Sequence, residues 1–533
     1  MFLVAQQGQK QNHLFSLPVS GLLIAILALG VFFRFANLDK KIYWLDEFIT
    51  SLRISGYSAA ELTQDLFHGG EVTAGDIQKY QHIRSERSLL DVIGSLVLQK
   101  REPPLYYVLA RLWAELFGDS IAAIRALSAF LSVLAIASLY WLSRELFGSL
   151  RITWMAIAFT AISPFHVLYA QEARPYSLWL LMTVISCATL LATIRLGKAW
   201  SWGLYALTLV AGIQTHFFFG LVLLGHVIYL LSLKTNTFKK SSPYLAAGVA
   251  ALVVYCVVGV LSGFSEGQIT AGWFGATALG PLDRLKRWTV VFSSGFIDTG
   301  GVDVLKANYG FDSSWIHLIR LPVLFLIAYS FYFMYLHAPQ RIWLFVLALT
   351  GATVIPLILA DLTLGWQVSA HPRYLTPYYL GALLCVAYLL AVKIGSPDVS
   401  QQRIWRLVAI LIVSSGIVSC AISLPAETWW NKEGSNPQIA RIINQATRPV
   451  LIAAEGGSFV NAFSLIRLLA PDVRIRLIAH SNRLEIPDDS SNVFLISPTE
   501  RVRQRLERTG YRIEAVNDSD LQRVKRMPKF SGN

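Results

Sequence analysis

Charged residues are scarce in this sequence. Asp, Glu, Lys and Arg together make up 15% of its 533 residues, and 54% of the residues are hydrophobic. A soluble domain carries about a quarter charged residues, so this composition does not fit a soluble enzyme. With a mean hydropathy of +0.50, the sequence predicts a polytopic α-helical membrane protein.

Cysteine is also rare, and none of the four cysteines has the spacing of a metal site or of a disulfide framework. All four lie inside apolar runs, which favours packing as small hydrophobic side chains. They are Cys187, Cys256, Cys385 and Cys420.

Acidic residues are fewer than basic ones, 33 against 46, which gives a formal net charge of +13. Such an excess can indicate nucleic-acid binding. Here the basic residues lie mostly in short loops between apolar runs, which is typical of membrane topology and not of a face that binds a phosphate backbone. We therefore expect a lipid bilayer and no nucleic acid as partner.

Eleven apolar runs predict membrane-spanning helices. The first, residues 17–33, follows a short polar tail and is either a signal peptide or an uncleaved span. We favour the span because the run reaches Arg34 without a small-residue cleavage site. The other runs are residues 121–143, 152–168, 177–194, 202–215, 217–233, 244–262, 316–336, 342–360, 374–392 and 404–424.

The loop charges predict an orientation. Residues 34–102 hold nine basic and ten acidic residues and are expected outside the cytoplasm. The next apolar segment, residues 103–117, contains Arg111 and Glu115 and is too short to cross, so we interpret it as a helix in the interface and not as a short span. Every second loop then carries the basic residues, which places the N-terminus inside and the C-terminus outside.

The composition changes after Pro425. Residues 431–533 hold 16 basic and 11 acidic residues with short apolar runs. Strands expected at 450–454, 474–479, 492–497 and 511–516 alternate with helical segments, which predicts a small α/β domain. We accordingly divide the chain into a transmembrane domain, residues 1–430, and a soluble extracytoplasmic α/β domain, residues 431–533.

Polar chemistry gathers in the outer loops and not at the mid-depth of the spans, where a proton-coupled transporter would place it. Four patches mix charge, aromatic rings and proline beside a helix end, at residues 44–47, 101–104, 163–176 and 371–374. Anchoring at the interface is the ordinary explanation for one such patch. Four of them on one face indicate a functional site.

The motifs in these patches follow a recognisable order: Asp46-Glu47, Pro-Pro-Leu-Tyr-Tyr at 103–107, Arg-Glu-Leu-Phe-Gly at 144–148, Gln-Glu-Ala-Arg-Pro-Tyr at 171–176, and Arg373-Tyr374. This order resembles the membrane glycosyltransferases of the C fold over most of residues 15–425. It is closest to the bacterial branch with the protein O-mannosyltransferases and the aminoarabinose transferase of lipid A. One departure is Glu102, directly before the proline pair, where members often carry His or Lys.

The resemblance implies an inverting glycosyltransferase that takes a sugar from a polyprenyl-phosphate carrier and passes it to a hydroxyl group. The reaction would take place at the outer face of the bacterial cytoplasmic membrane, and the acceptor is a glycan, a lipid or a protein. The hydroxyl needs a base, which we assign to Asp46, with Glu47 as second choice or as a solvated neighbour. Glu172 falls where the fold often places another acidic residue, to position the acceptor or to help hold a divalent cation. No cofactor is required, and the spacing does not define a metal site.

Negative charge builds on the leaving phosphate and requires cations and hydrogen-bond donors. Arg373 is the first candidate because its guanidinium matches phosphate oxygens, and Arg174 is either the second or a partner of Glu172. Tyr374 donates to the same phosphate or anchors the chain at the interface. The remaining candidates, all for substrate binding, are Glu102, Tyr176 and His216.

Two other functions remain open from the sequence. A lipid-linked sugar transporter or flippase would show an internal repeat, which we do not find. An assembly subunit of an envelope polysaccharide complex would not depend on Asp46 or Arg373. An aromatic and basic segment within residues 264–314 is expected either to cover the lipid carrier or to form an ordinary interfacial helix.

Overall fold

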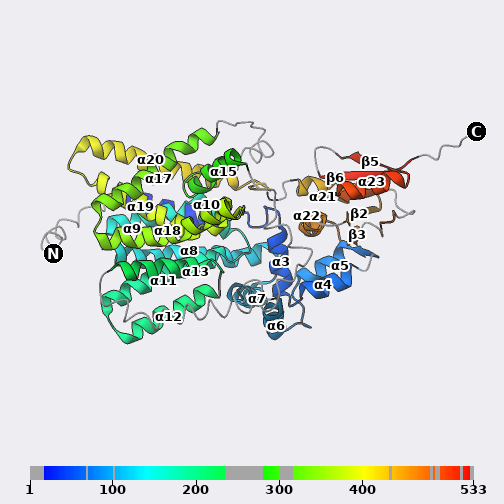
Figure 1. The fold of residues 1–533 in the computed structure, drawn as a ribbon, viewed down its shortest axis with the longest axis horizontal. Coiled ribbons are helices and arrows are strands. Elements are labelled where there is room, and N and C mark those ends of the chain that lie inside the picture. The colour runs from blue at the N-terminus through cyan, green and yellow to red at the C-terminus, as the bar shows by residue number, and fades with distance from the viewer. Residues whose placement is uncertain are drawn as a thin grey trace, which may run out of the picture.

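The computed structural model describes residues 17–67, 70–99, 103–233, 280–300, 316–430, 432, 435–454, 457–479, 484–486, 492–516 and 520–527. A helical bundle forms one half of the molecule and an α/β unit forms the other (Figure 1). Short helices between residues 45 and 117 lie where the two halves meet.

Long apolar helices build the bundle, as the sequence predicts, because in hydrocarbon a helix satisfies its own backbone polar groups. Among the described residues, six helices can each cross a membrane by length and composition, and the pair α9 and α10 is a seventh candidate, while α2, α12 and α13 contribute shorter apolar helices. This confirms a multi-pass α-helical membrane protein. The predicted span 244–262 lies outside the described residues. The bundle helices are α2 (Leu17–Phe35), α8 (Ile121–Phe147), α9 (Leu150–Ala161), α10 (Pro164–Ala170), α11 (Tyr176–Leu196), α12 (Ala199–Ile213), α13 (Phe219–Ser232), α17 (Ile316–His337), α18 (Gln340–Thr363), α19 (Thr376–Ile394) and α20 (Val399–Ser423).

The predicted continuous span 152–168 is broken, which corrects the sequence interpretation. Its two halves, α9 and α10, meet at an angle of 54°. Pro164 opens α10, and a proline inside a continuous helix would remove one hydrogen bond and clash with the preceding turn. Arg34 of α2 donates to the carbonyl oxygens of Ala161 at 2.5 Å and Thr160 at 3.0 Å. A buried arginine thus satisfies the carbonyl groups that the break leaves open.

Helices of the first loop are short and amphipathic. They are α3 (Leu45–Ile54), α4 (Ala59–Leu66), α5 (Ala74–Gln78), η2 (Lys79–Gln81), α6 (Leu89–Gln99) and α7 (Leu105–Phe117). Helix α7 has 13 residues and buries Tyr106, Tyr107, Ala110, Arg111 and Ala114 on one face. Its length confirms the prediction of a helix at 103–117 that is too short to cross.

A six-stranded mixed sheet, in the order β1-β3-β2-β4-β6-β5, is the centre of the α/β unit. Strand β2 pairs in parallel with β3 and β4, and the other pairs are antiparallel. The four strands expected from the sequence are present as β2, β3, β4 and β5, and β1 and β6 are additional. The strands are β1 (Glu71–Thr73), β2 (Pro449–Ala454), β3 (Arg474–Ile478), β4 (Asn492–Ile496), β5 (Tyr511–Ala515) and β6 (Leu521–Arg526), and the helices are α21 (Asn436–Gln445), α22 (Gly457–Leu465), η5 (Ile466–Leu468) and α23 (Glu500–Arg508).

The first loop contributes to this unit. Strand β1 is an edge strand in which Glu71 pairs with Arg476 of β3. Buried residues of α3 and α4 share one apolar core with α21, α22 and the sheet, and in it the rings of Phe48 and Phe463 lie 4.8 Å apart. The two halves of the molecule are therefore held together through residues 45–80, a segment that begins with the acidic pair.

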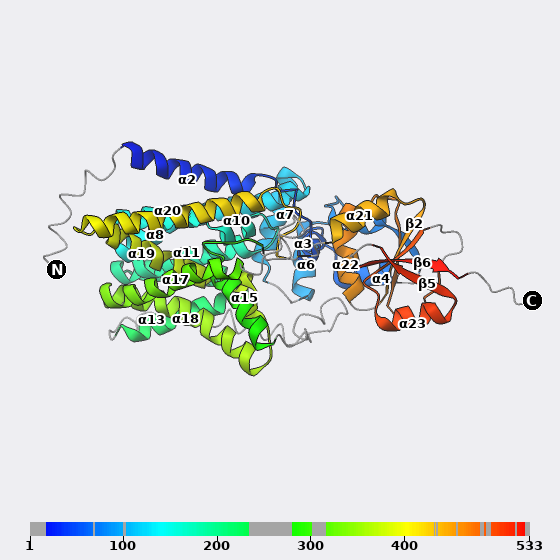
Figure 2. The ribbon, with the colours of Figure 1, turned by 90° about the horizontal axis from the view of Figure 1, so that it is seen from above.

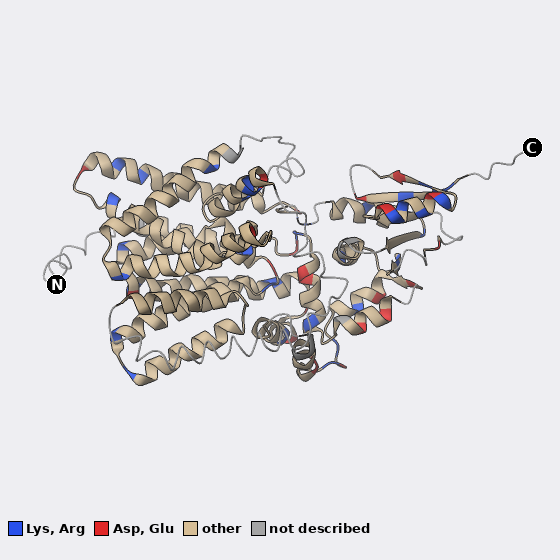
Figure 3. Cartoon of the chain, viewed as in Figure 1, with Lys and Arg blue, Asp and Glu red and all other residues tan. Residues whose placement is uncertain are grey.

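The two ends of the bundle differ in charge. Lys and Arg gather at the end away from the α/β unit, mostly in the helix ends that flank the loops after α8, α11, α17 and α19 (Figure 3). Seen from above, α2 and α20 run along one edge of the bundle, and α15 (Pro281–Ser293) lies at the end that faces the α/β unit (Figure 2). The described basic loops thus share one end, as the loop charges predict.

Candidate functional site

The acidic pair Asp46 and Glu47 lies in the first turn of α3, where the bundle meets the α/β unit (Figure 1). Trp44 precedes the helix in an extended conformation. Because Asp46 and Glu47 are among the first helical residues, both carboxylates lie at the positive end of the helix dipole. The two residues are 1% and 0% exposed. Burial of a carboxylate costs free energy unless it has partners, and the two residues have different partners.

Glu47 uses both oxygens in hydrogen bonds. Oε1 accepts from Arg125 Nε at 2.7 Å and from the backbone N–H of Ala173 at 2.7 Å, and Oε2 accepts from Arg125 Nη2 at 2.5 Å. The interpretation of Glu47 as a solvated neighbour is therefore wrong. These bonds join α3 to α8 and to the loop before α11, which favours a positioning role over that of a base.

Arg125 is a site residue that the sequence reasoning did not single out. Its Nη1 donates to the carbonyl oxygens of Leu38 at 2.7 Å and Lys41 at 2.8 Å, and its Nη2 donates to that of Ile42 at 2.7 Å. It thus fixes the chain that leads into the acidic pair. A signal was present, because an arginine within an apolar helix usually marks a functional position.

One carboxylate oxygen of Asp46 has a hydrogen-bond partner, and the other has none among the described residues. Its Oδ2 accepts from Arg373 Nη1 at 3.1 Å and lies 3.9 Å from Arg174 Nε. Its Oδ1 is buried and has no hydrogen-bond partner among the described residues. Buried polar atoms almost always have a partner, so such an oxygen is a candidate for contact with a substrate.

Arg174 lies beside Asp46, so the suggestion that it pairs with Glu172 is wrong. Its Nη1 donates to the backbone oxygen of Asp46 at 3.2 Å and to Tyr107 Oη at 3.1 Å. Arg53 Nη1 donates to the same tyrosine hydroxyl at 2.8 Å. Tyr107 thereby ties the first turn of α7, directly after the proline pair, to the acidic pair.

A buried carboxylate accepts hydrogen bonds from the backbone of the loop that carries Arg373 and Tyr374. Asp361, near the end of α18, accepts from the backbone N–H groups of Val368 at 2.7 Å and Ser369 at 2.9 Å. The short helices η3 (Val368–Ala370) and η4 (Pro372–Tyr374) follow. This loop brings Arg373 Cζ to 5.5 Å from the Trp44 ring centre and 5.1 Å from that of Tyr374.

The surroundings of this loop keep His371 and Tyr374 uncharged. Burial, reinforced by the nearby guanidinium of Arg373, lowers the pKa of His371 to about 3. Burial likewise raises the pKa of Tyr374, which keeps its hydroxyl protonated and able to donate. At neutral pH the positive charge of this loop is therefore that of Arg373.

Glu172 pairs with Lys432, which comes from the segment between α20 and α21. Glu172 Oε1 accepts from Lys432 Nζ, and Glu172 Oε2 is buried without a partner in the described part of the chain. The ammonium lies 4.3 Å from the Trp44 ring centre and 5.3 Å from that of Tyr169. Burial raises the pKa of Glu172, an effect that Lys432 opposes. Trp44 therefore contacts two cations, Lys432 and Arg373.

Tyr176 and His216, two of the three substrate-binding candidates, pack against aromatic rings. Tyr176, at the start of α11, packs edge-on against Tyr169 with ring centres 4.8 Å apart. His216 stacks on Trp179 with ring centres 4.1 Å apart and lies 6.4 Å from the ring of Tyr374. Glu102 lies outside the described residues.

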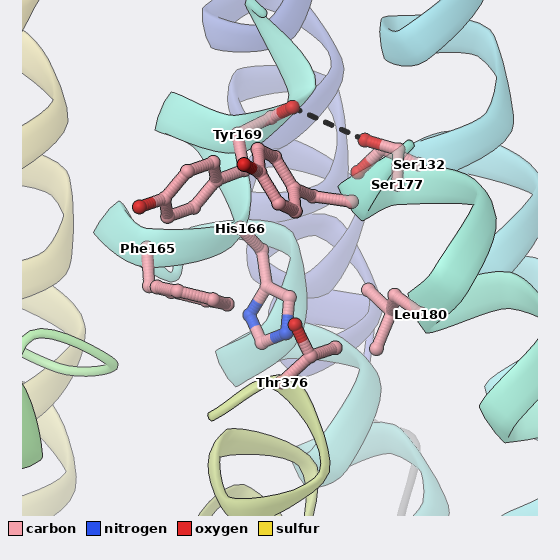
Figure 4. Close-up of a pocket in the computed structure, with 8 residues that line it drawn as sticks. Ser132, Phe165, His166, Tyr169, Ser177, Leu180 and Thr376 are labelled. Atoms are coloured by element: carbon pink, nitrogen blue, oxygen red, sulfur yellow. Dashed lines mark hydrogen bonds between the residues drawn. The ribbon is translucent and has the colours of Figure 1, made fainter. Parts of the chain in front are cut away.

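A small cavity lies between His166, Leu180 and Thr376 (Figure 4), and Tyr176 is another of its lining residues. It has a volume of about 10 Å³, which is room for about one water molecule. His166 Nε2 and Thr376 Oγ1 line it, and neither atom has a hydrogen-bond partner among the described residues. Asp46, Glu172 and Arg373 do not line this space.

The described residues contain no group of three His, Cys, Asp or Glu side chains that could hold a metal ion. The site as described is thus built from paired charges and aromatic rings. Its carboxylates are Asp46, Glu47 and Glu172, and its nearest cations are Arg125, Arg174, Arg373 and Lys432.

Comparisons with known proteins support the expected resemblance. The family described as dolichyl-phosphate-mannose-protein mannosyltransferase matches residues 101–260. This match confirms the resemblance to membrane glycosyltransferases of the C fold for that segment. No curated protein matches the chain.

Several solved structures are similar in fold. ArnT from Cupriavidus metallidurans bound to undecaprenyl phosphate is 14% identical, with 96% of this chain and 98% of that chain covered and a TM-score of 0.49. The same protein in the apo state is 15% identical, with coverages of 79% and 87% and a TM-score of 0.43. The Archaeoglobus fulgidus oligosaccharyltransferase tethered with an acceptor peptide is 12% identical, with a TM-score of 0.41. The match covers 72% of this chain and 56% of that archaeal protein, so the chain spans just over half its length.

Proposed function

We propose that this chain is an inverting glycosyltransferase of the cell envelope. It moves a sugar from a polyprenyl-phosphate carrier to a hydroxyl group of a glycan, a lipid or a protein. The family match over residues 101–260 and the multi-pass helical fold support the reaction class. The polar centre at one end of the bundle supports a reaction at the membrane surface.

The observation that carries this proposal is the environment of Asp46. Its Oδ2 is held by Arg373, and its buried Oδ1 has no partner among the described residues. An ionised carboxylate with one oxygen open can accept a proton from an acceptor hydroxyl. The neighbouring Glu47 has both oxygens in hydrogen bonds and holds the turn in place.

The displacement uses these groups as follows. The acceptor oxygen attacks the anomeric carbon of the sugar from the side opposite the phosphate, and its proton passes to Asp46 Oδ1. The bond between the anomeric carbon and the phosphate oxygen breaks, and its electron pair remains on the leaving phosphate. Arg373 and Arg174 stabilise this charge, since a guanidinium matches phosphate oxygens well. The step inverts the anomeric centre and requires no cofactor.

The other candidates have supporting roles in this proposal. Tyr374 donates a hydrogen bond to the phosphate, and its protonated hydroxyl beside Arg373 supports that role. We assign Tyr176 and His216 to binding of the sugar, and Glu102 stays a candidate for the same role from the sequence alone. Glu172 positions the acceptor, a role that its buried Oε2, which has no partner in the described part of the chain, supports.

We place the protein in the bacterial cytoplasmic membrane, with the N-terminus inside and the α/β unit outside. The concentration of Lys and Arg at the end away from the α/β unit supports this orientation (Figure 3). The lipid-linked donor would then enter the site from the outer leaflet.

Replacement of Asp46 by Asn tests the proposal. We expect this variant to fold and to lose transfer by about 10²- to 10⁴-fold, because the amide cannot accept the proton. The measurement is mass spectrometry of the products that the purified full chain forms from polyprenyl-phosphate sugars. Asp39→Asn is the matched control, since Asp39 is an exposed carboxylate of the same loop and should not affect transfer.

Full activity in the Asp46→Asn variant would refute the assignment of the base. Movement of the lipid-linked sugar across the membrane without a new glycosidic bond would favour a flippase instead. An intact envelope phenotype after changes at both Asp46 and Arg373 would favour an assembly subunit.

A further inference from the structure

Lys432 enters the site from a segment that the proposed reaction does not use. This segment leads from α20 to α21 and is fastened just before Lys432 by two indole groups. Trp429 Nε1 and Trp430 Nε1 donate to the two oxygens of buried Asp298, at 2.9 Å and 3.0 Å. A segment fixed in this way can present the next side chain at a defined place.

The ammonium group of Lys432 lies in an aromatic setting. Ring centres surround it at 4.3 Å for Trp44, 5.3 Å for Tyr169 and 5.8 Å for Trp430. Aromatic faces attract a cation but do not replace hydrogen-bond acceptors. With the described residues, the ammonium makes one side-chain hydrogen bond, to Glu172, although it has three donors.

The position of Lys432 relative to the proposed phosphate ligand is favourable. Both Lys432 and Arg373 lie against Trp44, at 4.3 Å and 5.5 Å from its ring centre. The two charges are therefore at most about 10 Å apart, and a lysine side chain has four rotatable bonds. The Lys432 side chain is 18% exposed, so it is not sealed in by the protein.

The charge balance also favours an anionic ligand. Glu47 is matched by Arg125, Glu172 by Lys432, and Asp46 by two arginines. Lys41 adds another amine, which donates to Gln171 Oε1 at 3.1 Å and to the carbonyl oxygen of Ser423 at 2.8 Å. The described cations beside these carboxylates favour an anionic ligand over a neutral one, because charge-assisted hydrogen bonds to phosphate are strong.

We propose that Lys432 is a ligand of the carrier phosphate, delivered by the segment that leads to the α/β unit. This inference rests on the proposed function, because it concerns the same donor. In the structure Glu172 accepts a hydrogen bond from the ammonium, which lies beside Trp44. When the lipid phosphate binds near Arg373, Lys432 leaves Glu172 and donates to a phosphate oxygen, and the interaction with the second cation strengthens binding.

A binding measurement tests this inference without transfer. The probe is undecaprenyl phosphate, titrated against the purified full chain in detergent, with undecaprenol as the uncharged reference. We expect Lys432→Gln to weaken binding of the phosphate about tenfold, since a charge-assisted hydrogen bond is lost. Lys432→Arg should bind within about threefold of the wild type because the charge remains.

Two variants separate this role from that of a purely structural ion pair. Lys40→Gln is the matched control, since Lys40 is an exposed lysine of the same end of the bundle and lies 3.9 Å from Glu427. It should leave binding unchanged. Glu172→Gln should strengthen phosphate binding, because it frees the ammonium, and this gain should disappear in the double variant with Lys432→Gln.

A purely structural pair would give the opposite pattern, with both single variants weakened alike. Wild-type affinity of a folded Lys432→Gln variant would also overturn the inference. If the wild type binds undecaprenyl phosphate through Lys432 but forms no product from any lipid-linked sugar, the proposed function fails and the phosphate ligand stands. If Lys432→Gln does not fold, the Glu172→Gln and Lys432→Arg variants still decide, because loss of affinity in Glu172→Gln contradicts the inference.

Discussion

Two arginine–glutamate pairs lie at opposite ends of the bundle and have nearly the same geometry. At the end that faces the α/β unit, Arg125 donates to the two oxygens of Glu47 at 2.7 Å and 2.5 Å. At the other end, Arg195 donates to the two oxygens of Glu145 at 2.9 Å and 2.7 Å. Their environments differ, because the side chains of the first pair are 2% and 0% exposed and those of the second are 59% and 12% exposed.

This difference distinguishes the roles of the two ends. An exposed pair interacts in water and contributes little to stability, so the charges at the basic end mainly set membrane topology. A buried pair has lost its hydration and is maintained only where its geometry serves a purpose. Burial of the pair, and not its geometry, therefore distinguishes the end that faces the α/β unit from the basic end.

The largest expected effect is at the buried pair. Arg125→Met would leave Glu47 buried without its partner, and loss of one member of such a pair costs about 3–5 kcal/mol of stability. We expect a strongly lowered midpoint of thermal unfolding for the purified variant. Double replacement with Glu47→Gln should recover part of this loss, since no isolated charge would remain. An unchanged midpoint in the single variant would contradict the comparison between the two ends.

Protonation of His371 tests the end of the bundle that faces the α/β unit in another way. The pKa of His371 is about 3 in the folded protein and about 6.5 in an unfolded chain. Below pH 6.5 the unfolded chain gains a proton that folded His371 does not accept, so stability falls as the pH falls toward 3. We expect His371 to account for about 1–2 kcal/mol of stability lost between pH 6.5 and pH 5.

Thermal unfolding at several pH values checks this expectation. The His371→Gln variant should show a flatter decline between pH 6.5 and pH 5 than the wild type. Equal slopes for the two proteins would show that this histidine is not kept neutral by burial and by Arg373.

Much of the fold could be predicted from the sequence because its signals are local. Apolar runs specify membrane helices, since hydrocarbon leaves few alternatives to a helix. Runs such as 450–454 and 492–496 specify buried strands in the same local way. Strand β1 could not be predicted, because it has three residues and pairs with a strand about 400 positions further along the chain.

The candidate site could be predicted only in part. Asp46 and Arg373 were singled out from motifs, and the structure brings them to 3.1 Å. Lys432 and Asp361 could not be found in this way, because their roles depend on contacts made through the tertiary fold. The break before Pro164 has a local signal in proline, but only the fold provides Arg34 to satisfy the open carbonyl groups.

The smallest effect is expected at the exposed pair of the basic end. Arg195→Gln removes the partner of Glu145, which keeps a hydrogen bond from Trp141 Nε1 at 3.3 Å, and the arginine side chain that is lost is 59% exposed. The loss should therefore be below about 1 kcal/mol and should shrink further at high salt. Thermal unfolding at low and high salt measures this effect, and transfer should equal that of the wild type. A loss as large as that of Arg125→Met would show that burial does not distinguish the two ends of the bundle.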